Sequence, residues 1–181
     1  PSPAQIDGFV LGERIHSGAM GYIHRVTGRE TGFPMIMKLP RVGAGESGEG
    51  LLAFETEAMI MPVLKGPHVA RFVAAGDLAK TPYLVVEWVD GQSLQQLLTE
   101  RRKFSAEEVA RIGAAIADAL HSLHRQDVIH LDLKPDNVIL RPEGGVILID
   151  FGLAHHARYP DLLAEEMRFA SGSSPYISPA Q

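Results

Sequence analysis

The chain has 181 residues, of which 45% are hydrophobic and 22% charged, and its formal net charge is −5. The apolar fraction excludes a wholly disordered chain, and the mild acidity excludes a dedicated nucleic-acid binder, which would carry a broad positive field. Because cysteine is absent, disulfides, thiolate zinc sites and thiol catalysis are excluded as well.

The sequence shows no signal peptide and no apolar run long enough to span a membrane, so we expect a soluble, cytoplasmic chain without membrane contact of its own. It begins with Pro1 rather than Met, which is typical of a domain cut from a longer protein. Membrane segments in flanking sequence would be compatible with this expectation.

The N-terminal half is predicted to be rich in strands. Residues 1–8 are expected to form a linker. A glycine-containing loop at residues 16–21 interrupts the first β-favouring stretch. One helix is predicted over residues 51–64, and Pro62 could end it early. Strands are predicted at residues 9–26, 33–39, 71–75 and 83–89.

After residue 90 the pattern changes to helices. A short helix is predicted at residues 93–98, and a long one at residues 105–125, where Ser105 and Glu108 form a capping box before apolar residues at helical spacing. Two apolar stretches, residues 138–140 and 146–149, flank a glycine turn and predict a hairpin. The fold class is therefore α+β, with a strand-rich lobe at residues 9–89 and a helical lobe at residues 90–181.

A first candidate for chemistry is the pair Lys38 and Glu57. A lone lysine in an apolar strand ordinarily faces water. Glu57, however, lies on the apolar face of the predicted helix, and a carboxylate that faces a packed interior needs a cation. Lys38 is the nearest one by topology. Such an ion pair would hold an ammonium beside a bound phosphate. The loop glycines Gly18 and Gly21 could offer backbone N–H groups to the same phosphate. The alternative for these glycines is an ordinary turn without a ligand.

The strongest segment follows the long helix. Asp132, Lys134 and Asn137 lie between apolar runs, and Asp150 ends a short apolar strand before Phe151. Carboxylate and amide oxygens suit Mg²⁺ that is shared with substrate phosphates. A separate Asp could orient a hydroxyl, and a Lys could neutralise a transferring phosphoryl group. The alternative, that these residues only form turns and caps, fits the spacing poorly.

Together these motifs resemble the catalytic domain of eukaryotic-type Ser/Thr protein kinases, of the kind also common in bacteria, over residues 9–181. The resemblance implies a two-lobe fold whose antiparallel N-lobe carries helix C and whose C-lobe stops after the activation segment. It implies ATP-dependent transfer of the γ-phosphoryl group to Ser or Thr of a protein substrate. Mg²⁺ is the implied cation, with Mn²⁺ as an alternative. Lys134, two residues after Asp132, is the Ser/Thr rather than the Tyr pattern.

The resemblance also implies the residue roles. Asp132 would orient the substrate hydroxyl, with Lys134 near the γ-phosphate, while Lys38, paired with Glu57, would hold the α- and β-phosphates. The metal ligands would be Asn137 and Asp150. Val86 stands at the gatekeeper position, and Glu87 and Val89 would offer backbone groups to adenine. The implied ATP-binding set is Ile15, Gly18, Gly21, Ile23, Ile36, Lys38, Val86, Glu87, Val89, Ser93, Ile139 and Asp150.

Four positions depart from the family pattern. His16 replaces the first loop glycine, and Ile36 replaces the small residue two before the lysine, which should narrow the roof over adenine. Leu131 stands where an arginine is expected, and Ala180 replaces the closing glutamate. The peptide-binding surface carried by later helices lies outside this chain, so exposed apolar surface predicts self-association.

Two other functions fit the same features. A pseudokinase-type nucleotide-binding or scaffold module usually loses Lys38, Asp132 or Asp150, and all three are present. A small-molecule kinase of related fold shares the acidic residues, but Lys134-Pro135 and Ser178-Pro179 favour a protein substrate.

The histidines are interpreted without a metal. The pairs His121/His124 and His155/His156 are predicted to lie on solvated faces, and His130 is predicted to pack under the metal-binding triplet.

Overall fold

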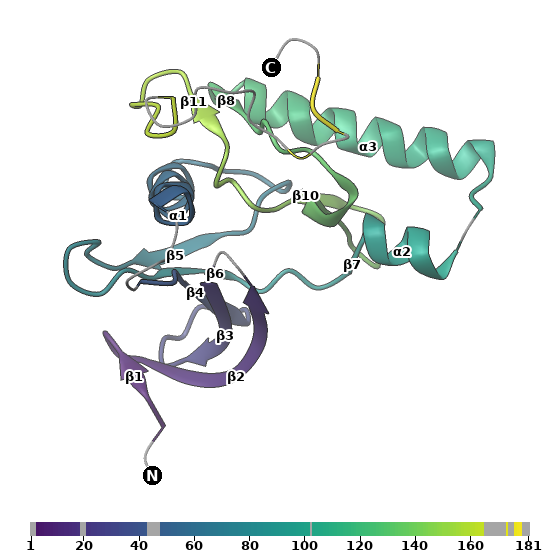
Figure 1. Ribbon diagram of the computed structural model, residues 1–181. Helices are drawn as coiled ribbons and strands as arrows, with labels where there is room; N and C mark the ends of the chain where they lie inside the picture. The colour runs from purple at the N-terminus through teal and green to yellow at the C-terminus, as the bar shows by residue number, and fades with distance from the viewer. Residues whose placement is uncertain are drawn as a thin grey trace.

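The computed structural model describes residues 3–18, 21–42, 48–101, 103–164, 173 and 176–178. The N-terminal half forms a six-stranded antiparallel sheet in the order β1-β2-β3-β4-β6-β5. Figure 1 shows this sheet at one end of the molecule, α3 at the other and α1 between them. The strands are β1 (Gln5–Ile6), β2 (Phe9–Gly18), β3 (Gly21–Thr27), β4 (Met35–Leu39), β5 (Phe72–Ala75) and β6 (Leu84–Glu87).

The linker expected at residues 1–8 is wrong at Gln5–Ile6, which pairs with β2. The connection is Asp7-Gly8, where φ is +47° and +83°. An Asp-Gly pair with both residues at positive φ is favoured in two-residue hairpin turns. The turn chemistry was therefore present in the sequence, although the strand before it is too short to show a pattern.

Helix α1 (Gly48–Ile60) begins before the predicted residue 51 and ends before residue 64. Pro62 explains the early end, because it has no N–H for a further helical hydrogen bond. The chain tightens there into a turn in which the Val63 N–H donates to the Ile60 carbonyl at 3.1 Å.

The C-terminal half contains two helices and two small sheets. Strand order is β10-β9-β7 in one sheet and β11-β8 in the other. The predicted capping box of α3 is confirmed, and a second one, Ser93 with Gln96, begins α2. The elements are β7 (Gln92–Ser93), α2 (Leu94–Glu100), α3 (Ala106–His124), β8 (Val128–Ile129), the 3₁₀ turn η1 (Pro135–Asn137), β9 (Val138–Leu140), β10 (Val146–Leu148) and β11 (His155–His156).

Strand alternation in β4 divides the hydrophobic core. Ile36 faces a cluster shared with Phe54 of α1, Leu123 of α3 and Leu148 of β10, so one core joins both halves. Met37, like Met35, packs on the other face with Phe9 and Val85. The shared core holds the sheet against the C-terminal elements and fixes the walls between them. In the described part of the chain, no helix combines the length and apolar character needed to cross a bilayer.

Candidate active site

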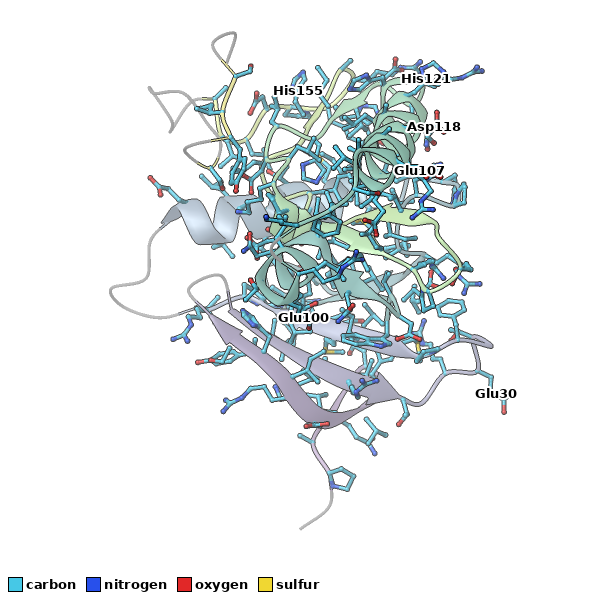
Figure 2. All side chains as sticks on the ribbon, turned by 90° about the vertical axis from the view of Figure 1, so that its right-hand side faces the viewer. Glu30, Glu100, Glu107, Asp118, His121 and His155 are labelled. Carbon is cyan, nitrogen blue, oxygen red and sulfur yellow. The ribbon has the colours of Figure 1, made fainter. Side chains whose placement is uncertain are left out.

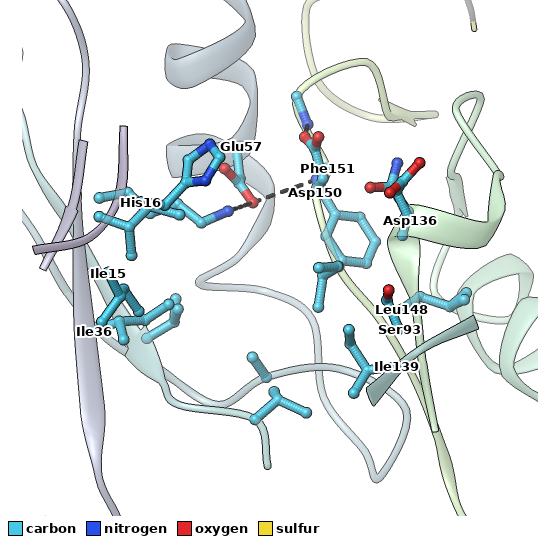
Figure 3. Close-up of a pocket in the computed structure, with 18 of the residues that line it drawn as sticks. Ile15, His16, Ile36, Glu57, Ser93, Asp136, Ile139, Leu148, Asp150 and Phe151 are labelled. Atoms are coloured by element: carbon cyan, nitrogen blue, oxygen red, sulfur yellow. Dashed lines mark hydrogen bonds and ion pairs between the residues drawn. The ribbon is translucent and has the colours of Figure 1, made fainter. Parts of the chain in front are cut away.

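A cavity of about 880 Å³ lies between the sheet and the C-terminal half. Figure 3 shows Ile15 and Ile36 on one side of it and Ile139 and Leu148 on the other, with Asp150 toward one end. Every predicted site residue lines this cavity except Gly18 and Asp132. The cavity therefore combines apolar walls with charged side chains gathered from distant parts of the sequence.

The predicted pair of Lys38 and Glu57 is confirmed, with 2.6 Å between Lys38 Nζ and Glu57 Oε1. The same carboxylate oxygen accepts a hydrogen bond from the backbone N–H of Phe151 at 3.3 Å. Glu57 thus connects β4, α1 and the segment after Asp150, and these contacts appear as dashed lines in Figure 3. Burial alone would lower the pKa of Lys38, but the negative charges of Glu57 and Asp150 outweigh burial and raise this pKa above its ordinary value. The ammonium is charged at pH 7.

Asp132 is held by its neighbours on the loop after β8. The Asn137 side-chain amide donates to the Asp132 carbonyl at 2.8 Å and to Asp132 Oδ2 at 3.2 Å. Lys134 Nζ lies 3.0 Å from Oδ2 and donates to the Ser173 hydroxyl at 2.8 Å. The other oxygen, Asp132 Oδ1, is buried and has no hydrogen-bond partner among the described residues. A buried carboxylate oxygen with no partner is costly unless a donor from a ligand completes it.

The donor set next to Asp132 fits a divalent cation. Asn137 is buried and uses its amide nitrogen for Asp132, which leaves its amide oxygen to offer. Asp150 adds a carboxylate and adopts φ +63°, an uncommon conformation for a residue other than glycine. Two oxygen ligands that share the rest of the coordination with phosphates and water are typical of Mg²⁺ sites.

His130 supports both acidic segments from below, as predicted. Its ring packs on Phe151 with centroids 5.0 Å apart. Burial lowers the pKa of His130, against the Ile149 hydrogen bond and the nearby carboxylates, so the ring is neutral. Nε2 lies 2.9 Å from the Ile149 carbonyl, which assigns the hydrogen to Nε2, and Nδ1 then accepts from the Asp132 N–H at 3.3 Å. One ring thus ties the Asp132 loop to the strand that leads to Asp150.

Comparison with known proteins agrees with this geometry. The chain matches the protein kinase domain over residues 9–180. It belongs to the protein kinase family. The two-lobe kinase fold expected from the sequence is therefore confirmed, and family membership implies the use of ATP and a divalent cation in general.

The kinases most similar to the chain include bacterial proteins. "Probable serine/threonine-protein kinase PknB" of Bifidobacterium longum is 25% identical and covers 96% of this chain, which corresponds to 26% of that protein. "Probable serine/threonine-protein kinase SCO3848" of Streptomyces coelicolor is 28% identical over 99% of this chain and 27% of its own length. The PknB kinase of Lactococcus lactis, with the same "probable" name, is 33% identical over 71% of this chain and 20% of its own length. The chain spans a fifth to about a quarter of the length of these relatives.

The side chain of Glu87 is engaged by two arginines, although this residue lines the cavity. Burial would raise the pKa of the Glu87 carboxyl, but hydrogen bonds and charge from Arg71, with a further bond from Arg141, outweigh it and lower this pKa. Arg71 Nε lies 3.0 Å from Glu87 Oε2, and an Arg141 guanidinium nitrogen lies 3.3 Å from Oε1. The Glu87 carboxylate is therefore held by Arg71 and Arg141. Ser93 lines the cavity, but its hydroxyl accepts the Gln96 N–H as the cap of α2.

Sequence reasoning missed some of the residues that line the cavity. Leu148 could have been found, because it lies two residues before Asp150 in an extended segment and so shares its face. His16 could not, because the β2–β3 register shifts between Arg14 and His16 and breaks the alternation. The His16 ring lies against Gly18, with Nε2 2.8 Å from where a Cβ on that glycine would be.

The histidine pairs differ from one another. His121 and His124 are exposed near the end of α3, as predicted, and Figure 2 shows His121 there. The solvated face predicted for the second pair is wrong for His156, which is 8% exposed and stacks on Tyr159 with ring centroids 4.1 Å apart. Pairing of β11 with β8 causes this burial. No group of three metal-ligating side chains occurs in the part of the chain that the structure describes. Pro179 and Ala180, two positions that the sequence analysis singled out, lie outside the described residues.

Proposed function

We propose that this chain is the catalytic region of a Ser/Thr protein kinase, which binds ATP in the cavity and transfers its γ-phosphoryl group to a Ser or Thr hydroxyl of a protein. The observation that carries this proposal is the free, buried Oδ1 of Asp132, beside the Lys134 ammonium. A carboxylate oxygen in this setting is suited to accept a hydrogen bond from an alcohol. The adjacent ammonium is suited to neutralise charge that moves toward that alcohol.

In the proposed reaction, the substrate hydroxyl donates to Asp132 Oδ1, which aligns its oxygen with the γ-phosphorus. The new oxygen–phosphorus bond forms as the bond to the bridging β,γ-oxygen breaks, and the hydroxyl proton passes to Asp132. Lys38, held by Glu57, would bind the α- and β-phosphates, and Lys134 the transferring group. Asn137 and Asp150 would hold Mg²⁺, or Mn²⁺ in its place, which supplies further charge neutralisation for the phosphates.

The apolar part of the cavity would take the adenine ring. Ile15, Ile23 and Ile36 line the sheet side, and Ile139 lines the opposite side. Apolar walls with a few placed polar groups are typical of small-molecule and cofactor sites. The backbones of Glu87 and Val89 would supply the polar contacts, beside Val86 and Ser93, while Gly18 and Gly21 would keep the loop close to the phosphates.

The organisation of the protein is part of the proposal. We assign residues 9–89 to the N-lobe with the hinge, and residues 90–181 to the part of the C-lobe that this chain contains. A cytoplasmic location is supported by the ATP requirement of the proposed reaction. Self-association is supported by apolar side chains exposed on the C-lobe, such as Val109 and Ile129. Sedimentation velocity over a range of concentrations would test this last point.

The deciding experiment replaces Asp132 with Asn and measures transfer from radiolabelled ATP to a basic protein substrate. We expect Asp132→Asn to remove at least 99% of transfer while nucleotide affinity stays within about twofold, because Asp132 faces the acceptor and does not hold ATP. Asp118→Asn, which changes an exposed α3 residue visible in Figure 2, is the control and should retain activity. Nucleotide binding without transfer by the unaltered protein would favour the scaffold function. Transfer to small alcohols alone would favour a small-molecule kinase.

A further inference from the structure

The hairpin that carries Gly18 and Gly21 is attached to the end of β4 at two points. The first is a close approach of backbones. Gly21 has φ +133°, and a Cβ there would lie 2.1 Å from the Leu39 carbonyl oxygen. Only glycine fits this position, so the first residue of β3 lies directly on the residue that follows Lys38.

The second attachment is made by the side chain of Arg41. Its Nε donates to the Gly18 carbonyl at 2.8 Å, and one terminal guanidinium nitrogen donates to the Ser17 hydroxyl at 3.4 Å. The guanidinium also lies over the Tyr22 ring, 4.9 Å from its centroid. Arg41 is half-buried, and its contacts span both strands of the hairpin. The planar guanidinium suits this combination of directed hydrogen bonds and ring stacking.

These two attachments place the hairpin relative to Lys38. β4 carries Lys38, and the residues just after it, Leu39 and Arg41, contact Gly21 and Gly18 respectively. We propose that Arg41 is a positioning residue that holds the Gly18 strand of the hairpin in register with the Lys38 ammonium, so that both meet the same phosphates. This rests on the proposed binding of ATP in the cavity.

The physical reason is the flexibility of glycine. A hairpin end with a glycine on each strand has many accessible conformations, and holding it in one of them costs conformational entropy. A hydrogen bond from a charged donor to the Gly18 carbonyl offsets part of this cost before the nucleotide arrives. Without Arg41, the nucleotide would have to order the hairpin itself. Removal of Arg41 should therefore weaken the affinity for ligands that carry phosphates and leave the affinity for ligands without phosphates unchanged.

Arg14 provides a matched control on the same ring. Its guanidinium lies over Tyr22 at 5.6 Å from the centroid, on an exposed side chain. Within the described residues it donates no hydrogen bond to the Gly18–Gly21 hairpin. Arg14→Met therefore removes an equal charge from the same surface and leaves the hydrogen bond from Arg41 to the Gly18 carbonyl, the tether of the hairpin, intact.

The test measures the affinity of the full chain for Mg·ADP and for adenosine by calorimetry. Arg41→Met should weaken ADP binding about fivefold to tenfold, the size expected for the net contribution of one ordinary hydrogen bond, because Arg41 acts through the hairpin and not on the nucleotide. It should change adenosine affinity less than twofold. Arg41→Lys, which keeps the charge but not the planar geometry, should lie between. Arg14→Met should bind both ligands as the unaltered chain does. Unchanged ADP affinity in Arg41→Met, or an equal loss for adenosine, would overturn the proposal.

Hydrogen exchange of the nucleotide-free chain gives a second readout. Amides of Ser17, Gly18 and Gly21 should exchange about fivefold to tenfold faster in Arg41→Met than in Arg14→Met, because the tether is lost. If the unaltered chain bound no ADP, the proposed function would fail, while this exchange difference would still decide whether Arg41 holds the hairpin. Equal exchange in the two variants would contradict the tether. Should Arg41→Met not fold, Arg41→Lys carries the same comparison.

Discussion

Helices α1 and α3 are built on opposite principles. α3 carries the capping box of Ser105 and Glu108, acidic residues in its first turn and histidines in its last, and an apolar stripe along one face. α1 has glycines at positions 48 and 50, and its buried face includes the polar residues Thr56 and Glu57. Thr56 Oγ1 is buried without a hydrogen-bond partner among the described residues, which costs stability.

The two helices differ in whether local signals or distant contacts fix their positions. α3 is specified mainly by signals within its own segment and anchors the core through Ala119 and Leu123. α1 depends on partners elsewhere, above all Lys38 on β4 and the Phe151 N–H. A helix that depends on contacts with the site can report the state of the site, whereas a helix specified locally serves as a fixed support.

The largest effect on stability should come from a substitution in α3. Leu123→Ala removes a fully buried side chain of α3 and should lower the free energy of unfolding by about 2–5 kcal/mol, through lost burial and the cavity left behind. Urea denaturation followed by circular dichroism measures it. Leu98→Ala, at a partly exposed position on α2, is the control and should cost much less. Equal costs would break the description of α3 as the anchor of the core.

The next effect should come from α1 and fall on function. Glu57→Gln should reduce phosphoryl transfer about hundredfold, equivalent to about 2.7 kcal/mol, because Lys38 loses the carboxylate that holds it. The pKa of Lys38 should fall, since burial lowers it and the raising effect of Glu57 is gone. The pH profile of Lys38 acetylation, read by mass spectrometry, should shift to lower pH. Glu55→Gln, a half-buried neighbour on α1, should leave both measurements unchanged; an unshifted profile in Glu57→Gln would contradict the coupling.

The smallest effect concerns the cap of α3. Hydrogen bonds from the Ser105 N–H and from Arg101 lower the pKa of Glu108 from 4.5 to about 2. A depressed carboxyl pKa stabilises the fold above the unfolded value, and this contribution is lost as the pH falls toward 2. Urea midpoints of the unaltered chain and of Glu108→Gln should therefore differ slightly at pH 6, approach each other below pH 4.5 and converge only as the pH falls through about 2. Glu107→Gln, on the same turn and visible in Figure 2, is the control. A difference that persists at low pH would show that the charge of Glu108 is not its source.

Local patterns were enough to predict α3, the β9–β10 hairpin and the acidic segments around Asp132 and Asp150. Each depends on residues close in sequence: a cap and its third neighbour, a turn between two apolar runs, or a polar group at the end of a strand. The ion pair of Lys38 and Glu57 could also be predicted, because a carboxylate on an apolar face requires a cation and few were near.

The sequence by itself therefore determined most of the longer elements, the kinase family and the side chains available for chemistry. Only the tertiary structure decided which of several partners a polar group took. The Glu87 carboxylate accepts hydrogen bonds from Arg71 and Arg141, and His156 is buried where β11 pairs with β8. Arg41 donates to the Gly18 carbonyl. The physical reason is range. Periodicity and capping act over a few residues, whereas these contacts join segments that come together only when the shared core closes.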